Sequence, residues 1–243
     1  MSGKGPYGQV VIRSSHEDLD EPTSHLLMPT VEQGPFLPFE RFAETLATRR
    51  AQLGLHPHRA EEVVTYVLDG YVHHEDGTGT HTVLAPGSVL VVTAHTEIRH
   101  DLTMQPSQQG RNAKWLSIVL RLPWHTEAPP NALQVKDAGD AVEAPDGLMR
   151  RPVTGPLARA ETFMGLECTD IEFAREAEAS FSIARKRRGV AYVLRGSGMI
   201  EKSGVQMGQG ALFENVTRLS MRGSPDFRVF LATVPFAESR AKG

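Results

Sequence analysis

Residues 55–70 read LHPHRAEEVVTYVLDG. The run Val63–Leu68 is rich in β-branched and apolar side chains and is followed by Gly70, a pattern that predicts a buried strand ending in a turn. His56 and His58 lie two positions apart, so in a strand both imidazoles project to the same face. Two imidazoles on one face can reach one metal ion. The stretch therefore predicts a strand and, directly before it, a candidate metal site.

Short runs of this kind recur along the whole chain. Further examples are Ser88–Thr93, Trp115–Leu122, Val190–Leu194, Ala211–Phe213 and Arg228–Val234. Glycine- and proline-rich turns separate them, which predicts an antiparallel β-barrel or sandwich. A helical pattern is confined to Pro38–Leu53, where Phe42, Leu46 and Leu53 could share one face. We expect an all-β chain with at most one helix or irregular arm there.

An internal repeat predicts two domains. The segments YVLDG (66–70) and PGSVL (86–90) have counterparts in YVLRG (192–196) and QGALF (209–213). A strand ending in glycine, a hairpin and a second strand form one supersecondary unit that is used twice. Proline and glycine punctuate residues 123–156, which we expect to connect the domains. The predicted domains are residues 1–133 and 134–243.

Charge and cysteine content exclude several classes of protein. The 243 residues carry a net charge of -3, so a broad basic field is absent and direct nucleic acid binding is not expected. The single cysteine, Cys168, excludes an internal disulfide and any multi-cysteine metal site. No apolar run reaches the roughly 18 residues needed to cross a bilayer, and the first twenty residues hold no long apolar stretch. We expect a cytoplasmic protein without a membrane partner.

A third histidine follows at a spacing that could complete the site. His100 lies 13 positions after Gly87, in the next predicted strand region. Two ligands from one strand and a third from a later strand can converge inside a closed barrel. The alternative is that His56, His58 and His100 line a polar pocket without binding metal.

The segments HPHRAEEVVTYVLDG (56–70) and PGSVLVVTAHTEIRH (86–100) resemble the pirin family. Flanking stretches are also similar to that family: GPFLPFERFAE (34–44), WLSIVLRLP (115–123) and YVLRGSGMIE (192–201). The resemblance implies two tandem cupin β-barrels, the first of which binds a mononuclear metal, usually iron, through three histidines and one glutamate. The three histidines of the family motif match His56, His58 and His100. The resemblance also implies two roles, which are oxygen-dependent cleavage of flavonols such as quercetin and protein-binding regulation, including transcriptional co-regulation.

The glutamate of the family motif is replaced here by Leu102. Leucine supplies neither the negative charge nor the oxygen ligand of a carboxylate. Three imidazoles can still bind a divalent metal, and we expect iron first, then manganese, nickel, cobalt or zinc, with an empty site as the alternative. The residues that could compensate are Glu97, in a shifted register with His95, then Asp101, and Glu62 as a ligand or as a partner of one, otherwise paired with a donor such as Arg59.

Three further histidines, His73, His74 and His81, are expected to face solvent. The repeat offset of 126 positions maps the histidine pair at 56 and 58 onto Ser182 and Ala184, so the second barrel is expected to lack metal ligands.

Two functions remain open from the sequence. The first is a metal-binding or regulatory protein with a degenerate three-histidine pocket and a protein partner. The alternative is a metal-dependent dioxygenase of the quercetin 2,3-dioxygenase type that acts on a small aromatic substrate.

Overall fold

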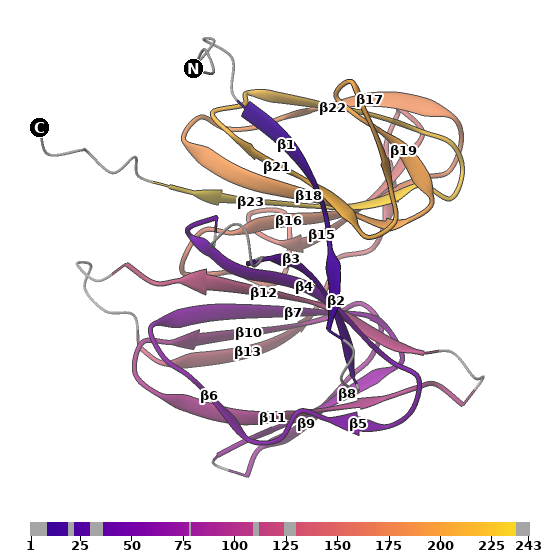
Figure 1. Cartoon of the computed structure of the whole chain (residues 1–243). Coiled ribbons are helices and arrows are strands. Elements are labelled where there is room, and N and C mark those ends of the chain that lie inside the picture. The colour runs from indigo at the N-terminus through magenta and orange to yellow at the C-terminus, as the bar shows by residue number, and fades with distance from the viewer. Residues whose placement is uncertain are drawn as a thin grey trace, which may run out of the picture. The chain divides into compact units, whose positions relative to one another are not determined.

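The computed structural model describes residues 9–18, 22–29, 36–77, 79–108, 112–123 and 130–236. The described residues form strands and turns without a helix, which confirms the all-β class (Figure 1). They group into two compact units. The first barrel comprises Ser15–Ala138 and Ala158–Met164, and the second comprises Gly139–Leu157, residues from 165 onward and the strand Gln9–Ser14. Residues 1–8, part of the stretch searched for a leader, and Gly34 and Pro35 of the family-like approach lie outside the described residues.

The first barrel consists of a large and a small antiparallel sheet. The large sheet has the order β13-β10-β7-β12-β4-β3-β2. Its strands are β2 (His16–Asp18), β3 (Thr23–Met28), β4 (Phe39–Ala47), β7 (Glu61–Asp69), β10 (Ser88–Ala94), β12 (Ala113–Arg121) and β13 (Ala132–Asp137). The small sheet has the order β5-β11-β8-β9, with β6 also paired to β11. Its strands are β5 (Ala51–Gln52), β6 (His56–His58), β8 (Tyr71–Asp76), β9 (His81–Leu84) and β11 (Ile98–Gln105).

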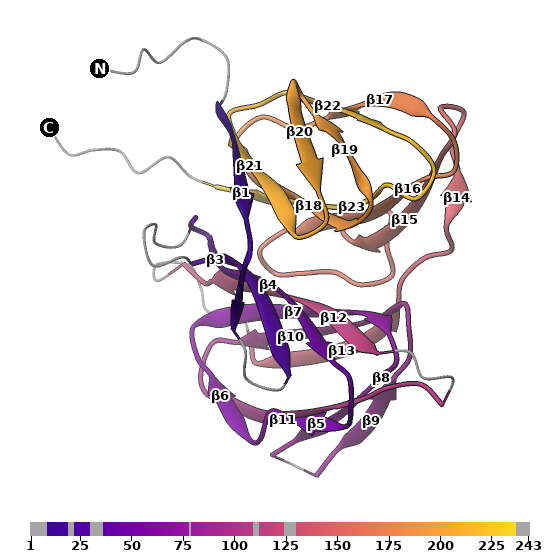
Figure 2. The same cartoon turned by 45° about the vertical axis from the view of Figure 1, so that its right-hand side comes forward.

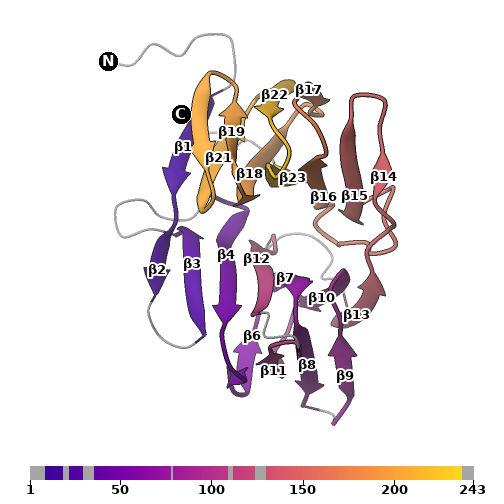
Figure 3. The ribbon, with the colours of Figure 1, turned by 90° about the vertical axis from the view of Figure 1, so that its right-hand side faces the viewer.

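The second barrel repeats this plan, with one strand fewer in its small sheet. Its large sheet has the order β1-β21-β18-β23-β16-β15-β14, and its small sheet the order β17-β22-β19-β20. The strands of the large sheet are β1 (Gln9–Ser14), β14 (Val142–Glu143), β15 (Leu148–Thr154), β16 (Glu167–Phe173), β18 (Arg187–Arg195), β21 (Gln209–Glu214) and β23 (Arg228–Pro235). Those of the small sheet are β17 (Ala177–Ser182), β19 (Ser197–Ile200), β20 (Ser203–Gln206) and β22 (Arg218–Gly223). Figures 2 and 3 show β1 beside β21, where it occupies the edge that β13 takes in the first barrel.

The two glycines that end the repeated strand motif have the same structural cause. Gly70 and Gly196 have φ angles of +68° and +72°, in the left-handed region that side chains rarely adopt. A Cβ atom at Gly70 would lie 2.7 Å from the Cα of Ala113, and one at Gly196 would lie 2.7 Å from the carbonyl oxygen of Asp226. Both turns therefore require glycine, which explains why the motif recurs.

Two expectations about local structure are wrong. The predicted helix at residues 38–53 is instead largely the strand β4, because pairing with β12 on one side and β3 on the other outweighs the helical propensity of its Glu, Ala and Leu residues. Residues 123–156 are more than a connection, since they contain β13, β14 and β15. β13 pairs with β10, so the first sheet runs to Asp137, past the predicted domain limit at 133.

Each barrel has its own apolar core between its two sheets. The core of the first includes Val67, Leu90 and Trp115, and that of the second is built around Phe173, Phe213 and Phe227. Burial of these side chains is the main driving force for closing each barrel. A search of the described residues for a helix long and apolar enough to span a membrane finds none.

Candidate metal centre

Three histidines converge on the inner face of the small sheet of the first barrel. In β6, His56 and His58 project to one side while Pro57 between them is exposed. The antiparallel pairing of β6 with β11 sets His100 directly opposite His56. The Nε2 atoms of His56 and His100 are 3.1 Å apart, and one ring nitrogen from each of the three histidines lies within 4.8 Å of the others.

Hydrogen bonds on the far side of two rings fix which nitrogen faces the cluster. The Nδ1–H of His56 donates to the carbonyl oxygen of Gly54 at 2.8 Å, because a carbonyl can only accept. The Nδ1 atom of His58 lies 2.9 Å from a carboxylate oxygen of Glu61. Both bonds leave the Nε2 lone pair directed into the barrel, the arrangement that metal-binding histidines use. The sequence singled out Glu62 and missed Glu61, although Glu61 is three residues after His58 and could have been considered as its partner.

Burial favours the neutral form of His56 and His100. His100 is completely buried, and burial lowers its pKa to about 3, with the neighbouring charges of His56, His58 and His74 acting in the same direction. Burial also lowers the pKa of His56, and the proximity of His58 and Arg41 acts in the same direction. Neutral imidazole is the form that donates a lone pair to a metal. Ligands at about 2.1 Å from one ion are about 3.0–3.4 Å apart, so the separation of the two Nε2 atoms fits a shared metal.

Comparison with known proteins identifies the domain that carries this cluster. The family model described as Pirin matches residues 21–117, which include all three histidines. Over these residues the chain is similar to the pirin family. A pirin-like protein from Caulobacter vibrioides is 32% identical over 111 residues, which span 42% of this chain and 40% of that protein. A quercetin 2,3-dioxygenase from Escherichia coli strain K12 is 26% identical over 185 residues, which span 75% of this chain and 76% of that enzyme.

Solved structures extend the likeness of fold beyond residues 21–117. The crystal structure of bacterial pirin YhhW from Escherichia coli in complex with nickel(II) covers 94% of this chain and 100% of that chain, with a TM-score of 0.78 at 19% identity. A structure from Geobacillus kaustophilus covers 95% of this chain and 97% of that chain, with a TM-score of 0.81 at 20% identity. At these identities the match shows the fold, which is the tandem cupin arrangement expected from the sequence.

Leu102 lies on the same inward face as His100, two positions further along β11. It is 4% exposed and packs in the apolar core of the barrel. An apolar side chain therefore stands at the position where the resemblance implies a carboxylate ligand.

The sequence did not predict the position of His74. We expected it to face solvent, and this expectation is wrong, because its side chain is completely buried. β8 pairs with β11 so that His74 is the register partner of Leu102, and the rings of His74 and His100 are 5.2 Å apart between centroids. Both of its ring nitrogens lack a hydrogen-bond partner among the described residues. The sequence did contain a signal for this burial. Val72 and His74 are two positions apart in β8, so an inward-facing Val72 places His74 on the same inward face.

The expectation of solvent exposure holds for the other two histidines. His73 is partly exposed and His81 is exposed, as expected, and their rings are 5.5 Å apart between centroids.

The proposed compensating carboxylates lie outside the histidine cluster. Glu97 is exposed and pairs with Arg99 at 3.3 Å, and His95 beside it is exposed as well. Asp101 accepts a hydrogen bond from the side chain of Gln52 and acts on His56 only through its charge.

Glu62 is buried on the opposite side of β7 from Glu61, as alternation along a strand requires. Its carboxylate accepts hydrogen bonds from the Thr93 hydroxyl at 2.9 Å and from the backbone amides of Phe163 at 2.7 Å and Met164 at 2.9 Å. Glu62 therefore fastens the segment Ala158–Met164 to the rest of the first barrel. These donors take the place of Arg59, the partner considered from the sequence.

A cavity of about 260 Å³ opens onto the histidine cluster. Besides the three histidines it is lined by Ser24, Arg41, Thr45, Leu53, Val63, Thr65, Leu102, Trp115, Ser117 and Val119. The cavity thus combines hydroxyl groups, one guanidinium group and an aromatic wall around the candidate metal position.

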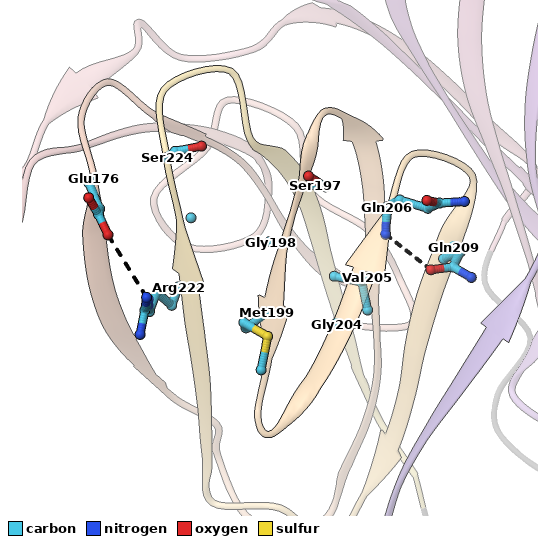
Figure 4. Close-up of a pocket in the computed structure, with 11 residues that line it drawn as sticks. Glu176, Ser197, Gly198, Met199, Gly204, Val205, Gln206, Gln209, Arg222 and Ser224 are labelled. Carbon is cyan, nitrogen blue, oxygen red and sulfur yellow. Dashed lines mark hydrogen bonds and ion pairs between the residues drawn. The ribbon is translucent and has the colours of Figure 1, made fainter.

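The second barrel has hollows of its own. Ser182 and Ala184, the counterparts of the histidine pair, line a cavity of about 390 Å³. A larger hollow, of about 600 Å³, lies beside the β19–β20 hairpin (Figure 4). Among the described residues that line it, the charged side chains are Glu176 and Arg222, which form an ion pair at 3.9 Å. Neither hollow gathers the imidazoles that distinguish the first barrel.

Proposed function

We propose that the protein binds one divalent metal ion through His56, His58 and His100. The observation that carries this proposal is the convergence of three imidazoles, of which His56 and His58 already hydrogen-bond through their outward nitrogens. A metal held there would act as a Lewis acid toward oxygen atoms bound in its open coordination positions.

The donor set bears on which metal the site prefers. Nitrogen ligands suit zinc, copper, nickel and iron, whereas a carboxylate would favour the harder ions such as manganese. The site contains three imidazoles and Leu102 in place of a carboxylate. Iron, which the resemblance implies, stays a prediction, and nickel is the metal of the related pirin structure.

Metal analysis tests the proposal. Protein expressed in medium containing iron, manganese, cobalt, nickel and zinc should carry close to one equivalent of divalent metal by elemental mass spectrometry. His56→Ala should lose that metal, while His81→Ala, which removes an exposed histidine of the same barrel, should retain it. Wild-type protein that carries no metal and binds none in calorimetric titrations would contradict the proposal.

Flavonol cleavage is a second candidate, supported by the relative named quercetin 2,3-dioxygenase that aligns with three quarters of the chain. The cavity supplies Trp115 as an aromatic wall but no carboxylate that could take the proton of a flavonol hydroxyl. Loss of quercetin absorbance in air, above a blank that contains the same metal alone, would support this activity. A rate equal to that blank for metal-loaded protein would exclude it, and the metal-binding role with a protein partner would then be the remaining proposal.

A further inference from the structure

The outward nitrogens of the three clustered histidines differ in their surroundings. The Nδ1 atom of His56 is hydrogen-bonded to a carbonyl oxygen, and that of His58 to a carboxylate oxygen. The Nδ1 atom of His100 is buried and has no hydrogen-bond partner among the described residues. A histidine that binds metal almost always donates its outer N–H to an acceptor, which fixes the orientation of the ring. As a metal ligand, His100 therefore needs an acceptor behind it.

His74 lies where such an acceptor is needed. It is completely buried, and both of its ring nitrogens lack a hydrogen-bond partner among the described residues. The centroids of its ring and that of His100 are 5.2 Å apart, close to the 4.6–5.0 Å that separate the three clustered rings. Burial lowers the pKa of both residues, which favours the neutral ring with one N–H donor and one acceptor nitrogen. A single hydrogen bond would satisfy one buried atom on each ring.

The other inward neighbours of His74 fit this role less well. Leu102, its register partner in β11, has no polar atom in its side chain. Asp76, two positions further along β8, accepts a hydrogen bond from the backbone amide of Thr80 at 2.9 Å. Because buried polar atoms without a partner are unfavourable, the exposed need on His100 and that on His74 are best met by each other.

We propose that His74 is a positioning residue of the metal site: in the metal-loaded protein, one of its ring nitrogens accepts the Nδ1–H of His100. This bond directs the Nε2 atom of His100 to the metal, as the carbonyl and carboxylate acceptors do for the other two histidines. The inference rests on the proposed three-histidine site and adds the residue that orients its third ligand. It also gives a role to a polar side chain that is buried in an apolar core.

Substitution of His74 tests the inference through zinc affinity and stability, measured on the same samples. His74→Leu should weaken zinc binding about 10- to 100-fold in competition with a chromogenic chelator, the range typical for loss of the partner of a ligating histidine. The urea midpoint of the metal-free protein should not fall, because the change removes two buried nitrogens that have no partner. The better of His74→Asn and His74→Gln, whose side-chain oxygens can accept the same N–H, should recover about fivefold of the affinity, the value of one hydrogen bond.

Val72→Ala is the matched structural control. It removes apolar volume from the same face of the same strand, so it should lower the urea midpoint and leave zinc affinity unchanged. Nitrogen-15 NMR of the zinc-loaded protein, labelled at histidine, reports the hydrogen bond directly. The Nδ1–H of His100 should exchange slowly and show a coupling through the hydrogen bond to a nitrogen of His74, and both signals should vanish in His74→Leu.

The outcomes separate this inference from the metal site on which it rests. Protein that binds no zinc overturns both. Equal zinc affinity of the wild type and His74→Leu overturns the positioning role and leaves the metal site standing. A weaker affinity without the coupling would assign the effect to packing, and a zinc-bound chemical shift at His74 would make it a fourth ligand; either result also overturns the inference.

Discussion

Replacement of Glu62 by leucine should destabilise the first barrel without weakening metal binding. The change removes the acceptor for three donors, which are the hydroxyl of Thr93 and the amides of Phe163 and Met164, at 2.7–2.9 Å. A buried donor left without a partner costs about 1–3 kcal/mol. Removal of a buried carboxylate, whose pKa is raised by burial, offsets part of this loss. We expect a net loss of about 3 kcal/mol in the free energy of unfolding.

The stability of Glu62→Gln should lie between those of the wild type and Glu62→Leu, with a loss of about 1–2 kcal/mol in the free energy of unfolding. Its amide oxygen still accepts hydrogen bonds, while its amide nitrogen faces one donor. Urea unfolding and nickel titration on the same samples measure the two effects separately. Glu97→Gln, an exposed carboxylate with one long ion pair, is the control and should change stability by less than about 0.5 kcal/mol. A Glu62→Leu protein of wild-type stability that binds nickel tenfold more weakly would refute the reasoning and make Glu62 part of the metal site.

Three further predictions concern the cluster and its frame. Because the pKa of His100 is lowered to about 3 in the folded protein, its contribution to stability is complete above the ordinary value of 6.5 and is lost as the pH falls from 6.5 toward 3. The metal-free protein should lose up to about 1.4 kcal/mol per pH unit there, and His100→Leu should show a shallower slope in urea midpoints measured against pH. Leu102→Glu should raise nickel affinity by at least about tenfold over Leu102→Gln, and equal affinities would mean that position 102 does not face the metal. Gly70→Ala should cost about 3 kcal/mol or more, since its new Cβ meets Ala113, whereas Gly79→Ala, which shares the positive φ but has no atom within 4 Å, should cost about 1 kcal/mol.

Much of the fold followed from local patterns. The repeated strand motif ending in Gly70 and Gly196 predicted two related domains, and the large sheets of the two barrels have corresponding strand orders. Strand runs such as Val63–Leu68 and Ser88–Thr93 lie within β7 and β10. The error at residues 38–53 arose because a short amphipathic stretch suits either a helix or a strand, and partners distant in the sequence decide between them.

Part of the candidate site also followed from the sequence alone. The sequence alone determined that His56 and His58 share a face, because alternation along a strand needs only neighbouring residues. It also determined that Leu102 supplies no carboxylate, which depends only on residue identity.

Only the tertiary structure decided which side chains meet. The register of β6 against β11 sets His100 opposite His56, and that of β8 against β11 buries His74 beside Leu102. Side chains alternate along β7, so Glu61 reaches His58 while Glu62 lies on the opposite face, where it accepts a hydrogen bond from the amide of Phe163. These outcomes depend on pairing between strands far apart in the chain, and a shift of one residue in that pairing would exchange the inward and outward side chains.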